Sequence, residues 1–581
     1  MNPYAYVLVT YLLMSLALTY PLITHIRTHT VGMGDNWQFQ WLFWWFDYSM
    51  RELGENPYYT YHQYYPMGTS LVKFESMPVM SAIAVMIQTF ASSVLAYNLI
   101  FLATFVFSAF GTYMLAEYLT GDRIASLFAG LLFAFAPQRI GFSFGFLNLM
   151  NVHFLPFYIL FLLKFLKERR YRYAILSSLF FSLNALSSWY LAILSIVVTV
   201  LCAAWFHKDL VKFSSRDGLK RMAVFALISF IFVFPFVFPL IQLAAEGNLA
   251  STMESSDIAA YLIPSTTNPF LKQYASPLKK LIPEPPSDMT LYIGFSVLLL
   301  VLHSIVRCNS SMVNFWKMVL IFFFVWSLGT NIKLFGKFTG IIPPLGFMTK
   351  LPVTGLITRL PAVAILIFMS SAILSAYAIS DIARRLAGTR AYLFYIVLLV
   401  VILVEFMPVP MYITKPYVPE FYNTISQDND DYAILELPFG ECPGKTCPSG
   451  EIAPFAYTFY LYYQTYHEKY IFGGYLARNQ PEENIMFTET TPVLYELKHS
   501  DIAESLPDRE TTLFILDNLN VRYIVLHKSF IWDIPSGSLK REKIVINNTY
   551  VARTSGLLND TLGDDLFYSD DMIMVYKVPE N

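Results

Sequence analysis

One carboxylate, Asp35, stands directly ahead of a dense aromatic run in the stretch "GDNWQFQWLFWW" (residues 34–45). Gly32 and Gly34 precede it and let the backbone turn sharply after the first apolar segment, so we expect the carboxylate to face a cavity under the following loop. A carboxylate in such a place is suited to act as a general base. The alternative is that Asp35 caps the helix that begins there. The aromatic residues indicate an interfacial belt at the lipid headgroups, without a catalytic role.

The same loop carries a histidine and a charged pair further along the chain. His62 lies in a tyrosine-rich stretch, and Lys73 and Glu75 follow it. We take His62 and Lys73 as candidate substrate contacts and Glu75 as a candidate second catalytic carboxylate. The alternatives are a packed tyrosine cover for the loop and a surface ion pair between Lys73 and Glu75, which would contribute little to stability.

Two arginines are expected on the same side of the membrane as Asp35. Arg139 lies between two short apolar runs, and Arg359 precedes the run that begins near residue 361. An arginine among apolar neighbours needs an anionic partner, and a lipid phosphate fits the forked guanidinium. For Arg139, a salt bridge with Asp35 and snorkelling of the side chain to the interface are equally open.

Four further residues fall in the neighbouring turns. Asn148 and His153 follow Arg139, and the next turn contains Trp189 and Tyr190. We take Asn148 and His153 as candidate substrate contacts. The Trp189–Tyr190 pair is a candidate lining for a sugar or a lipid.

The composition indicates what kind of scaffold must position these residues. The chain has 581 residues, of which 55% are hydrophobic and 14% charged, and its mean hydropathy is +0.48. These values are typical of an integral membrane protein. The first apolar run has no basic leading region and no small-residue cleavage site, so we interpret it as a retained transmembrane helix. The net charge of -2 gives no indication of a nucleic-acid partner.

About eleven apolar runs are candidates to cross the membrane. The longer runs lie near residues 4–24, 95–118, 188–206, 222–243, 290–306, 361–380 and 391–409, and the shorter ones near 123–136, 152–166, 173–184 and 314–329. Lys and Arg gather in the connections near residues 164–172, 207–221 and 381–390. The positive-inside rule predicts that these connections are cytoplasmic.

This assignment predicts a multi-pass protein of the cell membrane whose N-terminus is cytoplasmic. Segments 25–94, 244–289 and 330–360 then lie outside, as does the chain after about residue 410. The run at 76–91 must be a re-entrant or interfacial helix, because a span there would move the basic connections to the outside.

The chain changes character near residue 411, which predicts a transmembrane domain over residues 1–410 and an extracytoplasmic α/β domain over residues 411–581. The second domain has β-type runs at 432–438, 521–527 and 572–578 and helical stretches near 454–468 and 508–519. Cys442 and Cys447 flank a Pro/Gly turn. We favour a disulfide between them in an oxidising compartment, with a free thiol pair as the alternative.

Several short motifs, in order along most of the chain, resemble the GT-C superfamily of integral-membrane glycosyltransferases, and more closely its YfhO-like prokaryotic members. The motifs are "GDNWQFQWLFWW" (34–45), "YYPMGTSLV" (64–72), "FAFAPQRI" with "LNL" (133–149), "LPVTGLITRLPAVA" (351–364), "YYQTYHEKYIFGGYLAR" (462–478) and "LNVRYIVLH" (519–527). By this resemblance, Asp35 corresponds to the first-loop aspartate that acts as general base or orients a metal. Arg139 and Arg359 correspond to phosphate contacts.

The sequence departs from the superfamily pattern at two points. Residues 137–153 contain no Asp or Glu, although many relatives have an acidic residue on this loop. Glu75 is the candidate substitute, and the need for a divalent cation such as Mg²⁺ or Mn²⁺ stays open. The "WWDxG" signature of oligosaccharyltransferases is also missing, since "WWFDY" (44–48) has an extra residue, which argues against transfer of a glycan to asparagine.

The resemblance implies transfer of a sugar from a polyprenyl-phosphate donor to a lipid, glycan or protein acceptor outside the cytoplasm. A single base without a covalent nucleophile implies inversion at the anomeric carbon. A transporter or lipid flippase is the main alternative, but the spans hold almost no acidic residues at mid-depth. A third alternative is a non-catalytic membrane assembly protein.

Overall fold

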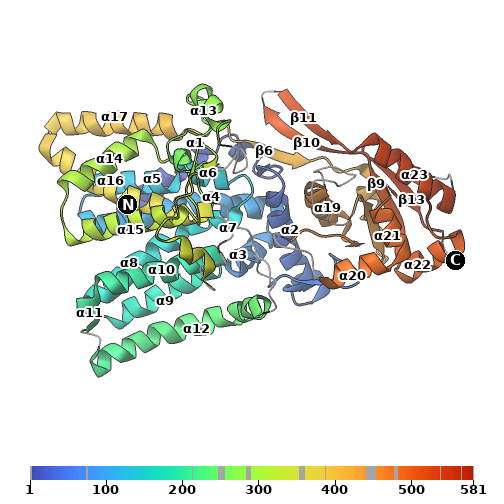
Figure 1. Ribbon diagram of the computed structural model, residues 1–581, viewed down its shortest axis with the longest axis horizontal. Coiled ribbons are helices and arrows are strands. Elements are labelled where there is room, and N and C mark those ends of the chain that lie inside the picture. Colours follow the sequence, from blue (N-terminus) through green and yellow to red (C-terminus); the bar gives the residue numbers. More distant parts are fainter. Residues whose placement is uncertain are drawn as a thin grey trace. The chain divides into compact units, whose positions relative to one another are not determined.

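The computed structural model describes most of the chain. The described residues are 3–72, 76–211, 214–245, 255–282, 290–351, 357, 360–386, 388–439, 453–476, 482–500, 502–536, 538–563 and 566–579. They form two compact units (Figure 1). The first unit comprises Met1–Thr24, Met77–Met80 and Leu99–Met411, and the second comprises His25–Ser76, Ser81–Asn98 and Tyr412–Asn581. Lys73, Glu75, Arg359, Cys442 and Cys447 lie outside the described residues.

Each of the eleven predicted apolar runs contains a helix. These helices are α1 (Pro3–Leu18), α4 (Ser93–Thr120), α5 (Arg123–Ala134), α8 (Leu155–Glu168), α9 (Tyr171–Ala185), α10 (Trp189–Trp205), α12 (Arg216–Ala245), α14 (Phe295–Arg307), α15 (Ser311–Ser327), α16 (Ile365–Leu386) and α17 (Gly388–Phe406). Six helical segments in the described part of the chain are long and apolar enough to cross a membrane. The protein is therefore a helical membrane protein, and the count of eleven spans stays a prediction.

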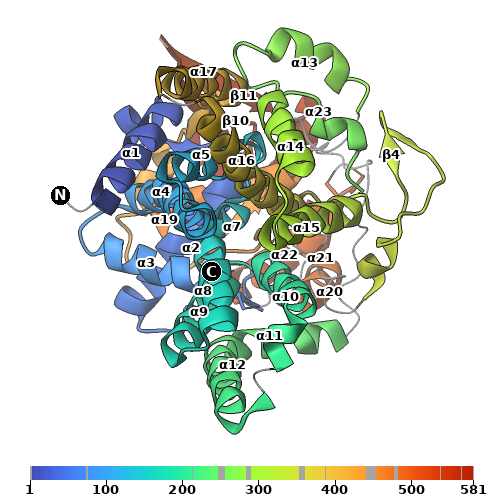
Figure 2. The same cartoon turned by 90° about the vertical axis from the view of Figure 1, so that its left-hand side faces the viewer.

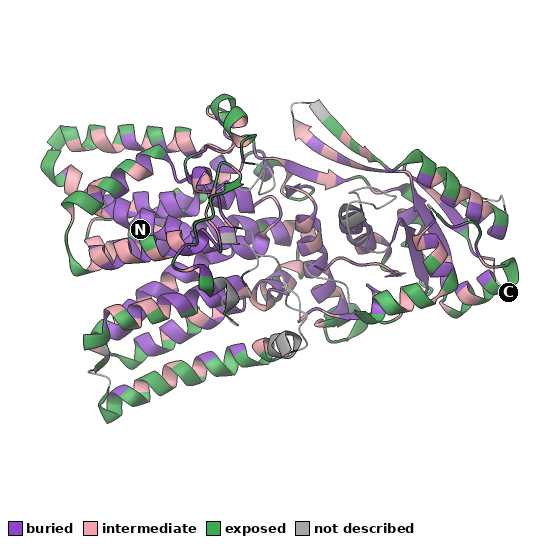
Figure 3. Ribbon diagram, viewed as in Figure 1, coloured by how far each residue is buried: buried purple, intermediate pink, exposed green. Residues whose placement is uncertain are grey.

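Burial separates the helices of the first unit into two kinds. Helix α16 is enclosed by α5, α14 and α15 and is buried along most of its length. Helices α12 and α17 are equally apolar but largely exposed, as their colouring in Figure 3 shows. A helix that is hydrophobic all round belongs in a protein core or in lipid. We therefore assign α16 to the core of the unit and the outer faces of α12 and α17 to the bilayer.

The segment predicted to be re-entrant or interfacial contains helix α3 (Pro78–Gln88), which has 11 residues. A span needs about 20 residues. The length of α3 therefore agrees with a helix that does not cross the membrane.

Short helices connect the longer ones in the first unit. They are α6 (Pro137–Phe142), α7 (Leu147–Met150), η3 (Val152–Phe154), α11 (His207–Val211), η5 (Ile258–Tyr261) and α13 (Lys272–Lys279). Pro137 ends α5 and begins α6, because proline lacks the N–H that would continue the helix but is accommodated in a first turn.

The second unit is built on two sheets. One has the order β1 (Thr30–Val31), β6 (Ile413–Pro416), β10 (Ser529–Ser536), β11 (Ser538–Val545), and the other has the order β12 (Tyr568–Ser569), β13 (Ile573–Lys577), β9 (Val521–His527), β7 (Ala433–Leu437), β8 (Tyr470–Ile471). Strand β7 pairs in parallel with β8 and β9, and β9 pairs antiparallel with β13. The three predicted β-type runs are confirmed as β7, β9 and β13.

Helices accompany these sheets. They are α18 (Glu420–Ile425), α19 (Ala453–His467), α20 (Glu482–Thr490), α21 (Pro492–Lys498), α22 (Arg509–Asn518) and α23 (Asn548–Leu562). The two predicted helical stretches are confirmed as α19 and α22.

The first loop contributes directly to the second unit. Strand β1 pairs antiparallel with β6, with Thr30 opposite Thr414. The Gly32 N–H donates to the Tyr412 carbonyl at 2.9 Å. The residues that surround Asp35 therefore fold together with the C-terminal part of the chain.

Candidate active site

Asp35 is the first residue of helix α2 (Asp35–Tyr48). Gly34 precedes the helix with a φ of 65°, a left-handed conformation that favours glycine. The alternative that Asp35 caps the helix is wrong, because Gly34 occupies the cap position. A carboxylate in the first turn is nevertheless stabilised by the helix dipole. Asp35 is only partly buried.

The hydroxyl of Tyr475 donates a hydrogen bond of 2.7 Å to Oδ1 of Asp35. The backbone of Tyr475 is fixed in turn by two side chains of the first loop. Gln38 Nε2 donates to the Tyr475 carbonyl at 2.9 Å, and the Tyr475 N–H donates to Gln63 Oε1 at 3.2 Å. Asp35 is thus oriented by a residue 440 positions away in sequence.

Two glycines permit this approach. The N–H of Tyr64 donates to the Gly473 carbonyl at 3.1 Å. A Cβ atom at Gly473 would lie 2.2 Å from the Tyr457 ring, and one at Gly474 would lie 2.5 Å from the Tyr64 ring. Both distances are shorter than a van der Waals contact. A larger residue at position 474 would push this segment away from Tyr64 of the first loop, and one at position 473 would push it away from Tyr457 of helix α19.

The aromatic run of α2 lies inside the second unit. Trp37, Trp41 and Trp45 are all fully buried. Trp41 Nε1 donates to Gln464 Oε1 of α19 at 2.8 Å, and the rings of Trp37 and Phe459 are 4.7 Å apart. The prediction that these aromatics form a headgroup belt is wrong for the three tryptophans. They pack α2 against α19 and so fix the helix that begins at Asp35.

His62 is buried among aromatic rings. Its ring lies 4.5 Å from that of Tyr470 and 5.0 Å from that of Trp45, measured between centroids. Burial lowers the pKa of His62 to about 4, so the imidazole is neutral near pH 7. The His62 carbonyl also accepts from Gln464 Nε2 at 2.6 Å. These contacts show that His62 packs the first loop against the segment that contains Gln464 and Tyr470.

Arg139 lies in α6 of the first unit and is 1% exposed. Snorkelling to the interface is therefore wrong for this side chain. Its guanidinium donates to the Ser108 and Thr104 hydroxyls, to the Thr104 carbonyl and, at 3.1 Å, to the Met150 carbonyl. It also lies 5.2 Å from the centre of the Phe105 ring.

The partners of Arg139 are all uncharged. Among the described residues of its own unit, no carboxylate forms an ion pair with it, and its Nε has no hydrogen-bond partner. A buried charge normally has a partner of opposite sign because its desolvation is costly. Arg139 is thus a buried cation whose neighbourhood in the first unit supplies no anion.

Asn148 and His153 belong to the same part of the first unit. Asn148 lies in α7, which also supplies the Met150 carbonyl to Arg139, and His153 in η3 is close enough to Arg139 to interact with it electrostatically. Both side chains are buried, and Asn148 Oδ1 and His153 Nδ1 have no hydrogen-bond partner among the described residues. His153 therefore lies near Arg139, and Asn148 lies in the short helix whose Met150 carbonyl accepts a hydrogen bond from Arg139.

Trp189 and Tyr190 begin helix α10. Trp189 packs against a cluster formed by Ala185, Ala192 and Val233, and Tyr190 is buried. These contacts connect α9, α10 and α12. The pair therefore contributes to helix packing in the first unit.

The described residues do not form the cation site that the resemblance leaves open. Within them, no group of three or more His, Cys, Asp or Glu side chains is placed to hold a metal ion. The partner of Asp35 described above is a tyrosine hydroxyl, and Glu75 lies outside the described residues.

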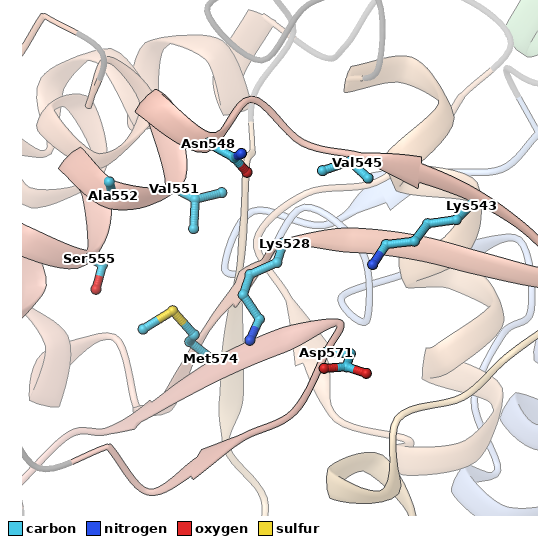
Figure 4. Close-up of a pocket in the computed structure, with 9 residues that line it drawn as sticks. All are labelled: Lys528, Lys543, Val545, Asn548, Val551, Ala552, Ser555, Asp571 and Met574. Carbon is cyan, nitrogen blue, oxygen red and sulfur yellow. The ribbon is translucent and has the colours of Figure 1, made fainter.

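A separate cavity of about 430 Å³ opens in the C-terminal part of the second unit (Figure 4). It is lined by Lys528, Lys543, Val545, Asn548, Val551, Ala552, Ser555, Asp571 and Met574. None of the residues singled out from the sequence lines it.

The sequence singles out Asp35 as a candidate but does not indicate the residues that contact it. Tyr475, Gln38 and Gln63 all fall in or beside the motifs quoted above. Tyr475 follows a Gly–Gly pair, and two adjacent glycines indicate a close approach of two backbones. The Gly–Gly pair therefore indicates a close approach, but the sequence does not show which segment approaches it.

Comparison with known proteins found solved structures with a similar fold but no relative by sequence. No protein-family model matches the sequence, and no curated protein is similar to it in sequence. The arabinofuranosyltransferase AftD from Mycobacteria has a similar structure, with a TM-score of 0.58 at 14% identity, covering 99% of this chain and 41% of AftD. The oligosaccharyltransferase of Archaeoglobus fulgidus, in a crystal structure with Zn and sulfate, has a TM-score of 0.50 at 13% identity, covering 90% of this chain and 68% of that one.

The chain thus spans about two fifths of the length of AftD. At these identities the similarity concerns the fold alone: this chain folds like an arabinofuranosyltransferase and an oligosaccharyltransferase.

Proposed function

We propose that the protein is a membrane glycosyltransferase that moves a sugar from a polyprenyl-phosphate donor to an acceptor outside the cytoplasm. The observation that carries the proposal is the placement of Asp35. In a fold shared with GT-C glycosyltransferases, this carboxylate begins a rigidly packed helix and is oriented by the Tyr475 hydroxyl at 2.7 Å.

In the proposed reaction, Asp35 acts as the general base. An acceptor hydroxyl attacks the anomeric carbon of the donor sugar, and the bond from that carbon to the lipid-phosphate oxygen breaks. The hydroxyl proton passes to the Asp35 carboxylate, and the lipid phosphate leaves with the electron pair of the broken bond. A single displacement without a covalent enzyme intermediate inverts the anomeric carbon.

We propose that Arg139 stabilises the departing phosphate. It is a buried cation with only uncharged partners in its unit, and a phosphate would supply the missing charge with charge-assisted hydrogen bonds. Asn148 and His153, which lie with Arg139, are proposed to contact the same donor group. Arg359 is proposed as a second phosphate contact.

Lys73 and Glu75 remain proposals from the sequence, Glu75 as a second catalytic carboxylate. Trp189 and Tyr190 are proposed to line the place of the donor's sugar or its lipid. The acceptor is proposed to be a lipid, a glycan or a protein.

The decisive experiment compares two carboxylates of the same helix. We expect Asp35→Asn to lower sugar transfer from a lipid-linked donor by about a hundredfold or more, the contribution of a general base. Asp47→Asn removes a carboxylate that pairs with Arg51 at 2.9 Å near the other end of α2, and it should retain transfer. Transfer is measured with purified protein in proteoliposomes, and gel filtration checks that both variants are intact.

Full activity of Asp35→Asn would overturn the catalytic assignment. If the protein in proteoliposomes moved the lipid-linked sugar across the bilayer without transferring it, that result would instead support the flippase alternative. Unchanged surface glycans in cells that lack the protein would favour the assembly role.

A further inference from the structure

Helix α13 carries an exposed apolar stripe outside the helix bundle. Phe270, Tyr274, Leu278 and Leu281 are all exposed, and Tyr274 is 64% exposed. Tyr274 and Leu278 lie within α13 (Lys272–Lys279), and Phe270 and Leu281 lie in the hydrogen-bonded turns at its two ends. The spacing of four, four and three residues places the four side chains on one side of this helical segment. In Figures 1 and 2, α13 projects beyond the neighbouring helices of its unit, and Figure 3 colours it largely as exposed.

The stripe is not the face that attaches α13 to the protein. Ala275 is fully buried, and Ile282 packs in a small cluster with Ala259 and Ile263 of the preceding segment. Successive residues of a helix are about 100° apart, so these inward residues lie beside the stripe rather than within it. The four large side chains are therefore presented outward.

Asn268 ties this segment to the end of a lipid-exposed helix. Its Nδ2 donates to the Val404 and Glu405 carbonyls, both at 2.9 Å, in the last turn of α17. Its Oδ1 accepts from the N–H groups of Phe270 and Leu271, also at 2.9 Å. Because α17 is a candidate membrane span, Asn268 attaches the segment to the end of a candidate span.

The charge of residues 270–282 indicates which kind of partner this surface binds. Residues 270–282 contain Lys272, Lys279 and Lys280 and no Asp or Glu. Large exposed apolar side chains mark a surface for a membrane or for another protein. Apolar residues on one face, lysines on the others and a position at a span end are the combination found in helices that lie in the interface of anionic bilayers.

We infer that residues 268–282 form a lipid-surface anchor that binds anionic phospholipid headgroups. The four apolar side chains enter the boundary between headgroups and acyl chains, and the lysines contact lipid phosphates. This inference does not depend on the proposed glycosyl transfer.

The test uses the full-length protein in lipid nanodiscs. A photo-crosslinking benzoylphenylalanine replaces Tyr274 on the stripe or, as a matched control, the neighbouring exposed Gln273 on another face. We expect lipid adducts at position 274 and few at 273, with more adducts when the nanodisc contains phosphatidylglycerol than when it contains phosphatidylcholine alone. The same replacement of Leu278 provides a second probe on the stripe.

A charge variant separates headgroup recognition from simple insertion. Lys272→Gln combined with Lys280→Gln should reduce the preference for phosphatidylglycerol about tenfold or more, since each lysine near an anionic surface contributes to binding. Raised salt should weaken the preference of the parent protein as well. Adducts to protein instead of lipid at 274 and 278, equal labelling at 273 and 274, or a lipid preference unchanged by the lysine variant would each overturn the inference.

Discussion

The hydroxyl oxygen of Tyr475 is one atom that orients Asp35, because its O–H donates a hydrogen bond of 2.7 Å to Oδ1 of the carboxylate. Tyr475→Phe removes that atom and keeps the ring. A hydrogen bond to a charged group contributes about 1.5–3 kcal/mol, and each 1.4 kcal/mol is about tenfold in rate. We expect kcat for sugar transfer to fall about tenfold to a hundredfold while KM for the donor stays within about twofold.

Tyr466→Phe is the matched control for this prediction. Tyr466 lies in the same motif, and its hydroxyl is 3.4 Å from that of Tyr462. Its activity should equal that of the parent protein. If Tyr475→Phe changed only the thermal stability and left kcat intact, Tyr475 would be a structural residue and not a positioning one.

At the residue scale, the sequence located the carboxylate but not its surroundings. Gly32 and Gly34 predicted a sharp turn before Asp35, and both adopt positive φ angles. The prediction of a headgroup belt was wrong for the tryptophans that follow. A helix with aromatic residues on all faces has the same sequence pattern whether its neighbours are lipid or protein. Only the distant partner, α19, distinguishes the two.

At the element scale, helices were predictable and strand pairing was not. Every apolar run contains a helix because length and hydrophobicity are local properties of the chain. The pairing of β1 with β6 joins Thr30 to Thr414. A strand of two residues has no periodicity to read, and nothing local to either segment specifies its partner.

The close approach of residues 62–65 to 471–475 gives the element-scale prediction. Gly474→Ala would place a Cβ 2.5 Å from the Tyr64 ring and 2.6 Å from Gln63 Oε1. Since Tyr64 is buried, relief requires the segments to separate, and overpacking of this kind costs about 1–3 kcal/mol. We expect a lower thermal midpoint together with reduced transfer, because Gln63 also holds the backbone of Tyr475.

Gly556→Ala is the control for this substitution. Gly556 lies within helix α23 and has no atom within 4 Å of the position that a Cβ would take. Alanine is favoured over glycine in a helix by about 1 kcal/mol, so this variant should be slightly more stable than the parent protein. Equal thermal midpoints for the two variants would contradict the packing argument.

At the scale of the whole molecule, two buried histidines of the second unit make its stability depend on pH. Burial lowers the pKa of His62 to about 4 and that of His467 to about 3. An unfolded histidine has a pKa near 6.5. Below that pH the unfolded chain binds protons that the folded protein does not, so the free energy of unfolding falls as the pH falls from about 6.5 to about 4.

We expect His62 alone to account for a loss of about 3 kcal/mol over this range, since one pKa unit corresponds to about 1.4 kcal/mol. His62→Phe keeps an aromatic ring among Tyr470 and Trp45 but cannot titrate, so its unfolding free energy should fall less steeply below pH 6.5. His207→Gln, at an exposed histidine, should leave the slope of the parent protein unchanged. Chemical unfolding of the detergent-solubilised full chain at pH 7, 6, 5 and 4 measures the slopes. Parallel slopes for His62→Phe and the parent would mean that His62 is protonated in the folded protein, and its ring would then face a compensating charge rather than the aromatic packing described here.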